Sequence, residues 1–496
     1  MTEQHIHITR INKQEYSFGL SNRDGMRYVA RVLTFKNPNF FVKNRRIEMF
    51  DKRAFTFRIG MLPTLIQNLQ EDGIEYQIED YDYQLPKSVK IDDRMSGNYI
   101  HQRKAVEAFF RRRFGIIQVP TRGGKTFIAS EIARIFLETD DGNFLFLTDN
   151  TTLHTQAVND LHKYFERYGG IEIGEIKAGK IDTTHRITVG MIQTIQSTLS
   201  KRCTDKVKQR TLKKYLKELK FLCVDEIHDN CSDSKLKLYK KECCNIDYQL
   251  CLSATPYRSE AFVQNLKLMA WSGDVVYEIS EETLRERKVL SDYQVFILFL
   301  DHNKIDYGEV IEEYGELRKH MIFQSKKRNG CLVKLISMFQ SKGLKTLVLF
   351  QSKEHGRIVS KLTGYTFIDG DTKNEEREQY KQKFLQEQGG VLMASNIFKK
   401  GVTLPEVQVL INADEGLEDA NTIQRKGRVL GATERKTKSL IVDFFDLYDL
   451  YFSGHSETRL QTYIESIGEN NVTILDMFQR DWLSDISNLT DKWFDL

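Results

Sequence analysis

Residues 116–130 read IIQVPTRGGKTFIAS, and this stretch decides how the rest of the chain is interpreted. The strict phosphate-loop motif is G-x-x-x-x-G-K-[ST], and Val119 stands where its first glycine belongs. What remains is Gly124-Lys125-Thr126, a tripeptide that is common by chance. Its context is more specific, because an apolar run precedes the loop and apolar residues recur at helical spacing after it. The sequence therefore predicts strand, loop and helix, an arrangement whose backbone N–H groups and helix N-terminus bind phosphate.

The alternation of apolar runs and amphipathic segments continues along the chain. Continuous Val, Ile, Leu and Phe runs are typical of parallel strands covered by helices on both faces, so we predict doubly wound α/β units. The first series of predicted strands comprises Phe114–Val119, Phe144–Leu147, Ile187–Met191, Phe221–Val224 and Gln249–Leu252. The second series comprises Thr346–Phe350, Tyr365–Ile368, Val391–Ala394, Val407–Ile411 and Leu440–Val442.

Two series of strands predict two α/β domains, which we place at residues 96–285 and 286–450. Residues 1–95 carry short alternating segments and one helical stretch, so we expect a small α+β domain there. Residues 451–496 read as a polar helical extension.

The composition is that of a soluble globular protein, with 40% hydrophobic and 29% charged residues in a chain of 496. No apolar run approaches the roughly 20 residues that span a bilayer, and the polar start MTEQHIHITR argues against a secretory signal. We therefore expect a cytoplasmic protein. No C-x-x-C pair occurs, so we predict neither disulfides nor a metal held by the 7 cysteines.

The net charge of +4 is small, but two segments concentrate positive charge. Each of the segments Arg27–Arg58 and Lys201–Lys220 holds nine basic and two acidic residues. The first also carries seven aromatic residues, a mixture that suits phosphate contact and base stacking, although several of these rings must belong to the core. The second is helix-like, and its charges fit a solvated face as well as a nucleic-acid contact.

Two acidic residues follow the predicted strand Phe221–Val224, in the sequence FLCVDEIHDN. Asp225 and Glu226 thus stand at the carboxyl end of a strand, where ligands bind in such sheets. A carboxylate there can hold Mg²⁺, mostly through water, and its neighbour can accept a proton from the attacking water. Acids after a strand also cap helices, and a metal site that includes His228 lacks partner ligands. Together with Lys125, the pair favours an ATPase.

Two further segments carry polar residues at suggestive places. YQLCLSATPYRS contains Ser253–Thr255 just after a predicted strand, a tripeptide that has no meaning alone. NTIQRKGRVLG, in the second series, groups Gln424, Arg425 and Arg428. Guanidinium groups can stabilise charge on a transferring phosphoryl group, although a solvated basic turn is the default interpretation of such a segment alone.

The order of these segments resembles that of the superfamily 2 helicases. The resemblance covers roughly residues 95–450, and the ordered set is far more specific than any one member. It implies two RecA-like domains that bind ATP and Mg²⁺ in the cleft between them and nucleic acid across their top. The matching segments are Gln102, PTRGGKT at 120–126, DEIH at 225–228, SAT at 253–255 and QRKGR at 424–428.

The resemblance assigns roles residue by residue. For ATP it implies adenine recognition near Gln102 and phosphate binding by Thr121, Gly123, Gly124, Lys125 and Thr126. For catalysis it implies Mg²⁺ binding by Thr126 and Asp225, water activation by Glu226, and completion of the site by Gln424, Arg425 and Arg428. Coupling of hydrolysis to movement would involve His228, Ser253, Ala254, Thr255 and Gly401. The weaker matches TTLHTQ, VGMIQT and ASNIFKKGVTLPEV imply nucleic-acid contacts by Thr151, Gln156, Gln193, Thr194 and Ser395.

The sequence departs from the family pattern in several places. Residues 149–150 are Asp-Asn where Pro-Thr is usual. The most serious departure is Gly431, which replaces the last arginine of the pattern Q-x-x-G-R-x-x-R. Either Arg425 and Arg428 suffice as arginine finger, or Arg435 reaches the site.

Residues 36–80 are similar in pattern and spacing to the N-terminal domain of the UvsW-type branch-migration helicases of bacteriophages. This resemblance implies that the partner is branched DNA, forked or four-way, and that Arg45, Arg46 and Arg53 contact its backbone. A phage-encoded chain would act in the host cytoplasm. We expect a monomer, because two motor domains in one chain already build a complete ATP site.

Alternatives remain open at this point. The same motifs fit an RNA helicase or a duplex-DNA translocase of the restriction-motor type, although the sequence shows no nuclease domain. A hypothesis of another class is a nucleic-acid-binding module that does not hydrolyse ATP. Gly431 is its only support, whereas Lys125, Asp225, Glu226 and Arg428 all remain.

Overall fold

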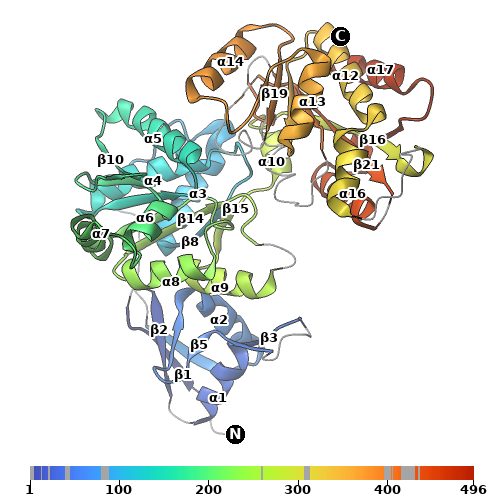
Figure 1. Ribbon diagram of the computed structural model, residues 1–496. Coiled ribbons are helices and arrows are strands. Elements are labelled where there is room, and N and C mark those ends of the chain that lie inside the picture. The colour runs from blue at the N-terminus through green and yellow to red at the C-terminus, as the bar shows by residue number, and fades with distance from the viewer. Residues whose placement is uncertain are drawn as a thin grey trace. The chain divides into compact units, whose positions relative to one another are not determined.

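The chain forms two compact units in the computed structural model (Figure 1). The first unit holds residues 1–120 and 124–279, and the second holds residues 280–496 with 121–123. We describe each unit separately. The structure describes residues 5–12, 14–20, 23–39, 45–79, 89–257, 261–305, 313–395, 404, 406–414, 430–433, 436–448 and 450–496.

The N-terminal part of the first unit is a small α+β domain, as predicted. Its five-stranded sheet has the order β5-β6-β2-β1-β7, and α1 and α2 contribute to its hydrophobic core. A separate hairpin, β3–β4, joins Thr34–Lys36 to Arg46–Glu48. The other elements are β1 His5–Arg10, β2 Glu15–Leu20, α1 Arg23–Val32, β5 Phe50–Asp51, β6 Thr56–Arg58, α2 Leu62–Glu71 and β7 Glu75–Glu79.

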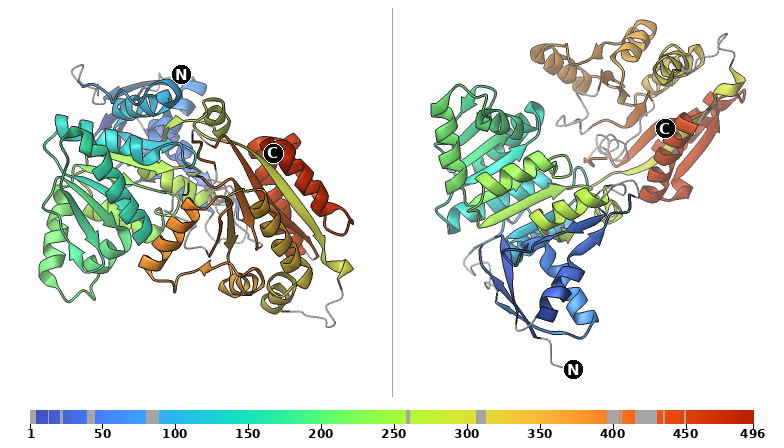
Figure 2. Two further views of the ribbon diagram at one scale, coloured as in Figure 1. Left: turned by 90° about the horizontal axis from the view of Figure 1, so that it is seen from above. Right: turned by 60° about the horizontal axis from the view of Figure 1, so that its bottom comes forward.

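This small domain packs directly against two helices of the following domain, α8 Asp233–Glu242 and α9 Phe262–Ser272 (Figure 2). The side-chain amide of Gln14 donates a hydrogen bond of 3.0 Å to the carbonyl oxygen of Cys243, just after α8. At Gly60 the two backbones come so close that a Cβ atom would collide with the carbonyl oxygen of Met269. The N-terminal domain is therefore in close contact with the α/β domain that follows it.

The rest of the first unit is built on an eight-stranded sheet of order β11-β10-β12-β9-β13-β14-β8-β15, parallel except for the β10–β11 hairpin. Helices cover both faces of this sheet (Figure 1). Its strands are β8 Phe114–Gln118, β9 Phe144–Thr148, β10 Ile173–Lys177, β11 Lys180–Ile181, β12 Ile187–Met191, β13 Phe221–Val224, β14 Tyr248–Ser253 and β15 Val275–Glu278. Its remaining helices are α3 Ile100–Arg112, α4 Lys125–Thr139, α5 Thr151–Phe165, α6 Ile192–Leu199 and α7 Lys206–Glu218.

Aromatic packing explains why the central strands are continuous apolar runs. Phe136 of α4 makes ring contacts with Phe144, Phe221 and Tyr248 on three neighbouring strands, at centroid distances of 6.2, 5.1 and 5.4 Å. On the opposite face, residues of α6, α7, α8 and α9 form a second buried cluster with the same strands. A strand covered on both sides has no polar face, which is what the sequence pattern indicated.

The second unit has a seven-stranded, fully parallel sheet of order β18-β19-β17-β20-β21-β16-β22. The doubly wound α/β prediction is thus confirmed for both motor domains. The strands are β16 Asp292–Asp301, β17 Thr346–Phe350, β18 Phe367–Ile368, β19 Val391–Ser395, β20 Val409–Asn412, β21 Lys438–Leu447 and β22 Val472–Asp476. The helices are α10 Glu281–Glu286, α11 Tyr314–Arg318, α12 Lys326–Ser341, α13 Lys353–Thr363, α14 Asn374–Gln386, α16 Leu450–Ile467 and α17 Trp482–Phe494.

The sequence pattern was wrong about the C-terminal extension, which is not purely helical. Its strand β22 pairs with β16 at the edge of the sheet, and Trp482 and Ile486 of α17 are buried in the core of the second unit. The pattern missed these contributions because β22 is only 5 residues long, and its pairing with β16 makes it a strand. Among the described helices, none has both the length and the apolar character needed to cross a bilayer.

Candidate functional site

The loop after β8 and the start of α4 are held by an adjacent glutamine. Gly124 has a φ of +93°, a left-handed conformation that favours glycine, and α4 begins at the next residue. The side chain of Gln102, on α3 and 5% exposed, lies so close that a Cβ atom at position 124 would collide with its amide nitrogen. The structure therefore brings together two residues that the sequence assigned separately to ATP.

Lys125 reaches across to the acidic pair that follows β13. Its Nζ lies 3.3 Å from Oε1 of Glu226, and both side chains are largely covered, at 12% and 16% exposed. Burial and the neighbouring Glu226 carboxylate raise the pKa of Asp225 to about 7, against the lowering effect of Lys125. Two acids and one lysine thus share a confined site at the carboxyl ends of β8 and β13, where ligands bind in parallel sheets.

Glu226 is held in an unusual conformation. Its φ is +43°, in the left-handed region that non-glycine residues rarely adopt and that costs of order 1–3 kcal/mol. Its Oε2 is buried and accepts no hydrogen bond from the residues that the structure describes, with Nδ1 of His228 at 3.4 Å. A strained acid with an unbonded oxygen, next to a carboxyl of raised pKa, fits the hard oxygen donors that Mg²⁺ prefers.

A chain of polar contacts leads from the acidic pair to the end of β14. Nδ1 of His228 lies 2.9 Å from Oγ of Ser253, and the same hydroxyl accepts a 3.0 Å hydrogen bond from the backbone N–H of Thr255. His228 and Ser253 are both buried. Among the predicted coupling residues, His228 therefore contacts both Glu226 and Ser253, and Ser253 contacts Thr255.

The residues predicted to contact nucleic acid lie at neighbouring strand ends. Nε2 of Gln193, at the start of α6, donates a 2.6 Å hydrogen bond to the carbonyl oxygen of Asp149, just after β9. The hydroxyl of Thr151 points to the sulfur of Met191 at 3.9 Å. Asn150, one of the departures from the family pattern, caps α5 by accepting from the N–H of Leu153 at 2.9 Å. The Asp-Asn pair thus has a structural explanation.

The remaining predicted contacts in this domain are Gln156 and Thr194. Gln156 donates a 3.4 Å hydrogen bond to Asp160 on α5, one turn further on. The carbonyl oxygen of Thr194 accepts from Oγ of Ser197 within α6. Gln193 is exposed and Thr194 is half-buried, so the α6 residues are open to a ligand.

Sequence reasoning missed a buried polar network that supports the ATP-side residues. Asp92 pairs with Arg94 at 2.6 Å, and the backbone N–H of Asp92 donates to Glu131 of α4. The Arg94 guanidinium lies over the rings of Phe127 and Tyr164, at 4.8 and 5.0 Å. The network fixes the chain that enters α3, and hence Gln102, against α4. No sequence signal marks it, because its members are far apart along the chain.

The described aromatic rings of the first basic segment, Arg27–Arg58, lie in or against the core of the N-terminal domain. Tyr28 and Phe57 are buried, and Phe35, Phe50 and Phe55 are half-buried and pack against the same core, as the sequence led us to expect for several of these rings. A small domain buries a limited fraction of its surface, so large aromatic side chains contribute much of its core. Phe40 and Phe41 lie outside the described residues.

The three arginines of this segment remain compatible with backbone contact. Arg46, on β4, and Arg53, in the turn before β6, are exposed. Arg45 is half-buried and its guanidinium donates to the carbonyl oxygen of Asn37 at 3.3 Å.

In the second unit the structure places only some of the predicted residues. Ser395 ends β19 and is 5% exposed. The carbonyl oxygen of Gly431 accepts a 3.1 Å hydrogen bond from Nζ of Lys436, and its backbone pairs with Leu290. Outside the described residues lie Gly401, Gln424, Arg425, Arg428 and Arg435.

The second unit also buries charges, but in matched pairs. Arg328 and Asp446, both 0% exposed, lie 2.5 Å apart, and Nε2 of His302 lies 2.8 Å from the same Asp446 oxygen. Burial by itself disfavours the Asp446 charge, yet Arg328 and His302 lower the pKa of Asp446 to about 2. Nearby, His355 pairs with Asp414, whose carboxylate also accepts two backbone N–H bonds.

Comparison with known proteins extends this picture. Residues 93–258 match the family described as "Type III restriction enzyme, res subunit", and residues 327–432 match "Helicase conserved C-terminal domain". The chain is 24% identical over 389 residues to helicase 22 of Sulfolobus islandicus filamentous virus, covering 73% of this chain and 65% of that protein. It is 22% identical over 359 residues to the ATP-dependent DNA helicase uvsW of Enterobacteria phage T4, covering 70% and 68%. The chain thus spans about two thirds of the length of these relatives.

Among solved structures, Dbp5 of S. cerevisiae bound to RNA and ADP BeF3 shares the fold, with a TM-score of 0.55 and 17% identity over 79% of this chain and 92% of that one. The two family matches follow one another in the chain, one on each of the two large α/β sheets. On these grounds the chain resembles the superfamily 2 helicases, the UvsW helicase among them.

Proposed function

We propose that this protein is an ATP-hydrolysing DNA helicase or translocase that remodels branched DNA, by Holliday junction branch migration and fork regression. The observation that carries the ATPase part is the contact between Lys125 and Glu226 at 3.3 Å, beside a carboxyl of raised pKa at the ligand-binding edge of the sheet. A lysine and two acids at strand ends, with a glycine-held helix N-terminus, are what binding and cleaving a nucleoside triphosphate requires.

Each residue of this site has a defined task in the proposal. Backbone N–H groups at Gly124 and the start of α4 would hold the phosphates, with Lys125 neutralising their charge. Thr126 and Asp225 would hold Mg²⁺, which stabilises negative charge on the transferring phosphoryl group. Glu226 would accept the proton of the attacking water, because its Oε2 is unbonded among the described residues and faces His228 rather than a permanent cation.

Coupling would use the contacts around His228. When the proton state or position of Glu226 changes on hydrolysis, His228 lies 3.4 Å away and passes the change to Ser253 and Thr255 at the end of β14. A bistable hydrogen-bonded element of this kind can bias a conformational equilibrium. From the second unit, Gly401, Gln424, Arg425 and Arg428 would complete the cycle; this assignment rests on the family resemblance.

The DNA part of the proposal rests on positions rather than on a bound strand. Gln193 and Thr151 lie at neighbouring strand ends of the first motor domain, and Arg46 and Arg53 are exposed on the N-terminal domain. The preference for branched DNA comes from the resemblance to UvsW-type helicases. Contacts of these kinds read the backbone, so base sequence should matter little.

The test is ATP-dependent conversion of a labelled four-way DNA junction into forked duplexes by the full chain, with Lys125→Ala alongside. We expect conversion by the wild type and none by the variant. ATP hydrolysis stimulated by DNA without conversion would reject the branch-migration part and leave a translocase. Stimulation by RNA in preference to DNA would replace the DNA assignment with an RNA helicase. No hydrolysis with any nucleic acid would reject the motor itself and favour a binding module.

A further inference from the structure

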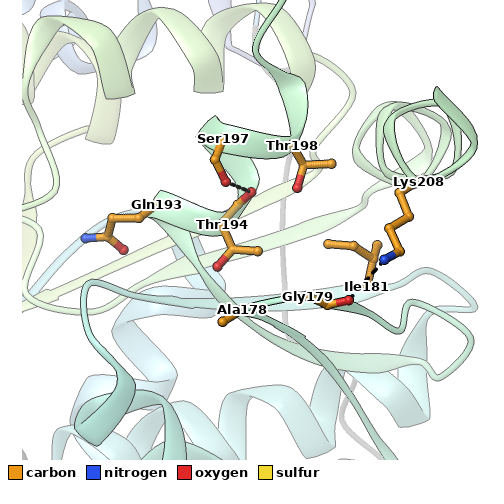
Figure 3. Close-up of a pocket in the computed structure, with 8 residues that line it drawn as sticks. All are labelled: Ala178, Gly179, Ile181, Gln193, Thr194, Ser197, Thr198 and Lys208. Atoms are coloured by element: carbon orange, nitrogen blue, oxygen red, sulfur yellow. Dashed lines mark hydrogen bonds between the residues drawn. The ribbon is translucent and has the colours of Figure 1, made fainter. Parts of the chain in front are cut away.

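A groove on the first motor domain begins where the predicted nucleic-acid contacts end. It has a volume of about 380 Å³ and is bounded by α6, by the turn between β10 and β11, and by one side chain of α7 (Figure 3). In Figure 3 the Lys208 side chain runs from α7 to the turn, where its Nζ donates to the carbonyl oxygen of Gly179 at 3.2 Å. The lining residues are Ala178, Gly179, Ile181, Gln193, Thr194, Ser197, Thr198 and Lys208.

A second hollow of about 760 Å³ continues from the first and shares two of its residues, Ser197 and Thr198. It runs along the loop from the end of α6 to the start of α7 and includes two exposed cations, Lys201 and Arg202. Hydroxyl groups recur along both hollows, at Thr194, Ser197, Thr198, Ser200 and Thr204. Hydroxyls and cations in alternation along a groove are donors for a chain of phosphates.

Helix α7 begins where the second hollow ends, and it carries a stripe of positive charge. Leu212, Tyr215 and Leu216 are buried at helical spacing, so this side of α7 faces the core. At 100° per residue the five basic residues of the stripe fall on the opposite side. All are exposed except Lys213, which is half-buried. The stripe comprises Lys206, Arg210, Lys213, Lys214 and Lys217.

The charge on this stripe is not neutralised by its surroundings. Arg210, Lys213 and Lys217 form no ion pair with the residues that the structure describes, and Lys214 lies 4.0 Å from Glu218. The lysines of the nearby hairpin differ, because Lys177 and Lys180 both pair with Glu175. A row of unpaired cations on one helix repels itself, a cost that a polyanionic ligand relieves.

We propose that the α6–α7 groove and the α7 basic stripe bind the sugar–phosphate backbone of a nucleic-acid strand that continues beyond Gln193 and Thr194. This inference rests on the proposed function and extends it, since it gives the motor a second contact that follows the first along one strand. Continuity is the main argument: Gln193 and Thr194 line the groove itself. The 13 residues of α7 extend the contact by about 20 Å, at 1.5 Å per residue.

The donors along the two hollows favour a nucleic acid as the ligand. Most of the residues that line them carry a hydroxyl, amide or cationic group, which can donate to phosphate oxygens. Phosphates need only donors and positive charge, with no base-specific contact. The surface therefore strengthens grip on a long strand and leaves sequence preference unchanged.

The experiment compares the full-length wild type with Arg210→Gln/Lys213→Gln/Lys217→Gln. The matched control, Lys237→Gln/Lys240→Gln/Lys241→Gln, removes the same charge from three exposed lysines of α8. Binding of fluorescent single strands of about 8 and about 30 nucleotides is measured by anisotropy over a salt series, together with ATP hydrolysis. Thermal unfolding of each variant confirms that these surface changes leave the fold intact.

We expect the α7 variant to bind the long strand about tenfold more weakly than the control at low salt. Its slope of log affinity against log salt should fall by about 2, since each lost phosphate contact on a single strand contributes about 0.7. The short strand should bind all three proteins alike. Equal long-strand affinity and slope in the α7 and α8 variants would overturn the proposal.

Two further outcomes separate this inference from its alternatives. A polyglutamate peptide that binds the wild type but not the α7 variant, with DNA binding unchanged, would reassign the surface to an acidic protein and overturn the proposal. If DNA stimulates ATP hydrolysis but the α7 substitutions do not change long-strand binding, the groove proposal is overturned and the proposed motor function stands. If the α7 substitutions weaken long-strand binding but no nucleic acid stimulates ATP hydrolysis, the groove proposal is supported and the proposed motor function is overturned.

Discussion

Each motor domain buries a cluster of charges, and the two clusters behave in opposite ways. In the first unit Asp225 has a raised pKa, and Glu226 combines a positive φ with a buried oxygen that accepts no hydrogen bond from a described residue. In the second unit Arg328 and His302 lower the pKa of Asp446. Burial opposes both charges, so the difference comes from the partners: a matched cation in one domain and mostly like charge in the other.

This difference separates charges that stabilise a fold from charges that serve a ligand. A buried carboxylate with its own arginine has its electrostatic partner inside the protein. Two neighbouring carboxylates that share one lysine have more negative than positive charge, and a bound metal cation can supply the difference. We therefore interpret the Asp446 cluster as structural and the Asp225 cluster as functional.

The largest expected effect is on catalysis. Replacing Glu226 by Gln should reduce ATP hydrolysis by about 1000-fold, because the site loses its proton acceptor while its shape is kept. ATP binding, measured with a fluorescent analogue, should persist. Glu242→Gln changes another buried acid of the same domain and should leave hydrolysis unchanged. Similar losses in both variants would show that the comparison assigns Glu226 wrongly.

The second expected effect is on stability. Replacing Arg328 by Met should cost about 3–5 kcal/mol of unfolding free energy, because Asp446 then remains buried without its cation. Guanidinium unfolding of the full chain measures it. Adding Asp446→Leu should restore part of the loss by removing the orphaned charge. A loss of unfolding free energy below about 1 kcal/mol in Arg328→Met would contradict the interpretation of this cluster as structural.

Replacing Asp225 by Asn should have a smaller effect of opposite sign. Without nucleotide the variant should be more stable than the wild type by about 1 kcal/mol, because a carboxyl of raised pKa destabilises the fold when charged. The variant should also lose the thermal stabilisation that Mg²⁺ and ATP give the wild type. Destabilisation by this substitution would place Asp225 with the structural charges.

The finest distinction is in pH dependence. Asp446 has a pKa lowered to about 2, so its stabilisation is complete above about pH 4 and is lost as the pH falls towards 2. Asp225 has a pKa raised to about 7, so its destabilisation is absent below about pH 4 and grows as the pH rises towards 7. Melting temperatures of Asp446→Asn and Asp225→Asn relative to wild type, from pH 2 to 8, should therefore vary in separate windows. Parallel profiles would contradict the comparison.

The two basic segments show how far composition can mislead. Arg27–Arg58 and Lys201–Lys220 have the same counts of basic and acidic residues. In the first, the described aromatic rings lie in or against the core, and the described cations are spread over helix α1, the β3–β4 hairpin, a turn and β6. In the second, the cations line one side of a helix beside a polar groove. Only the folded chain distinguishes these arrangements, because charge counts carry no direction.

The strands of both motor sheets could be predicted well where they are central. Ile187–Met191, Phe221–Val224 and Thr346–Phe350 have the predicted bounds, because strands covered on both faces are continuous apolar runs with polar residues around them. The long strand β16, Asp292–Asp301, was missing from both predicted series, although it lies between β21 and β22 in the second sheet. Edge strands such as β22 were missed because pairing, not composition, makes them strands.

The sequence by itself determined the fold class and supplied the proposed ATP-site residues of the first motor domain. It could do so because a phosphate loop and a strand-end acidic pair are local patterns, each made of neighbours along the chain. Tertiary structure decided how these patterns meet: Gln102 against Gly124, Lys125 against Glu226, and His228 against Ser253. It also decided which buried charges are matched, since a partner such as Arg328 for Asp446 stands more than a hundred residues away and only folding brings it close.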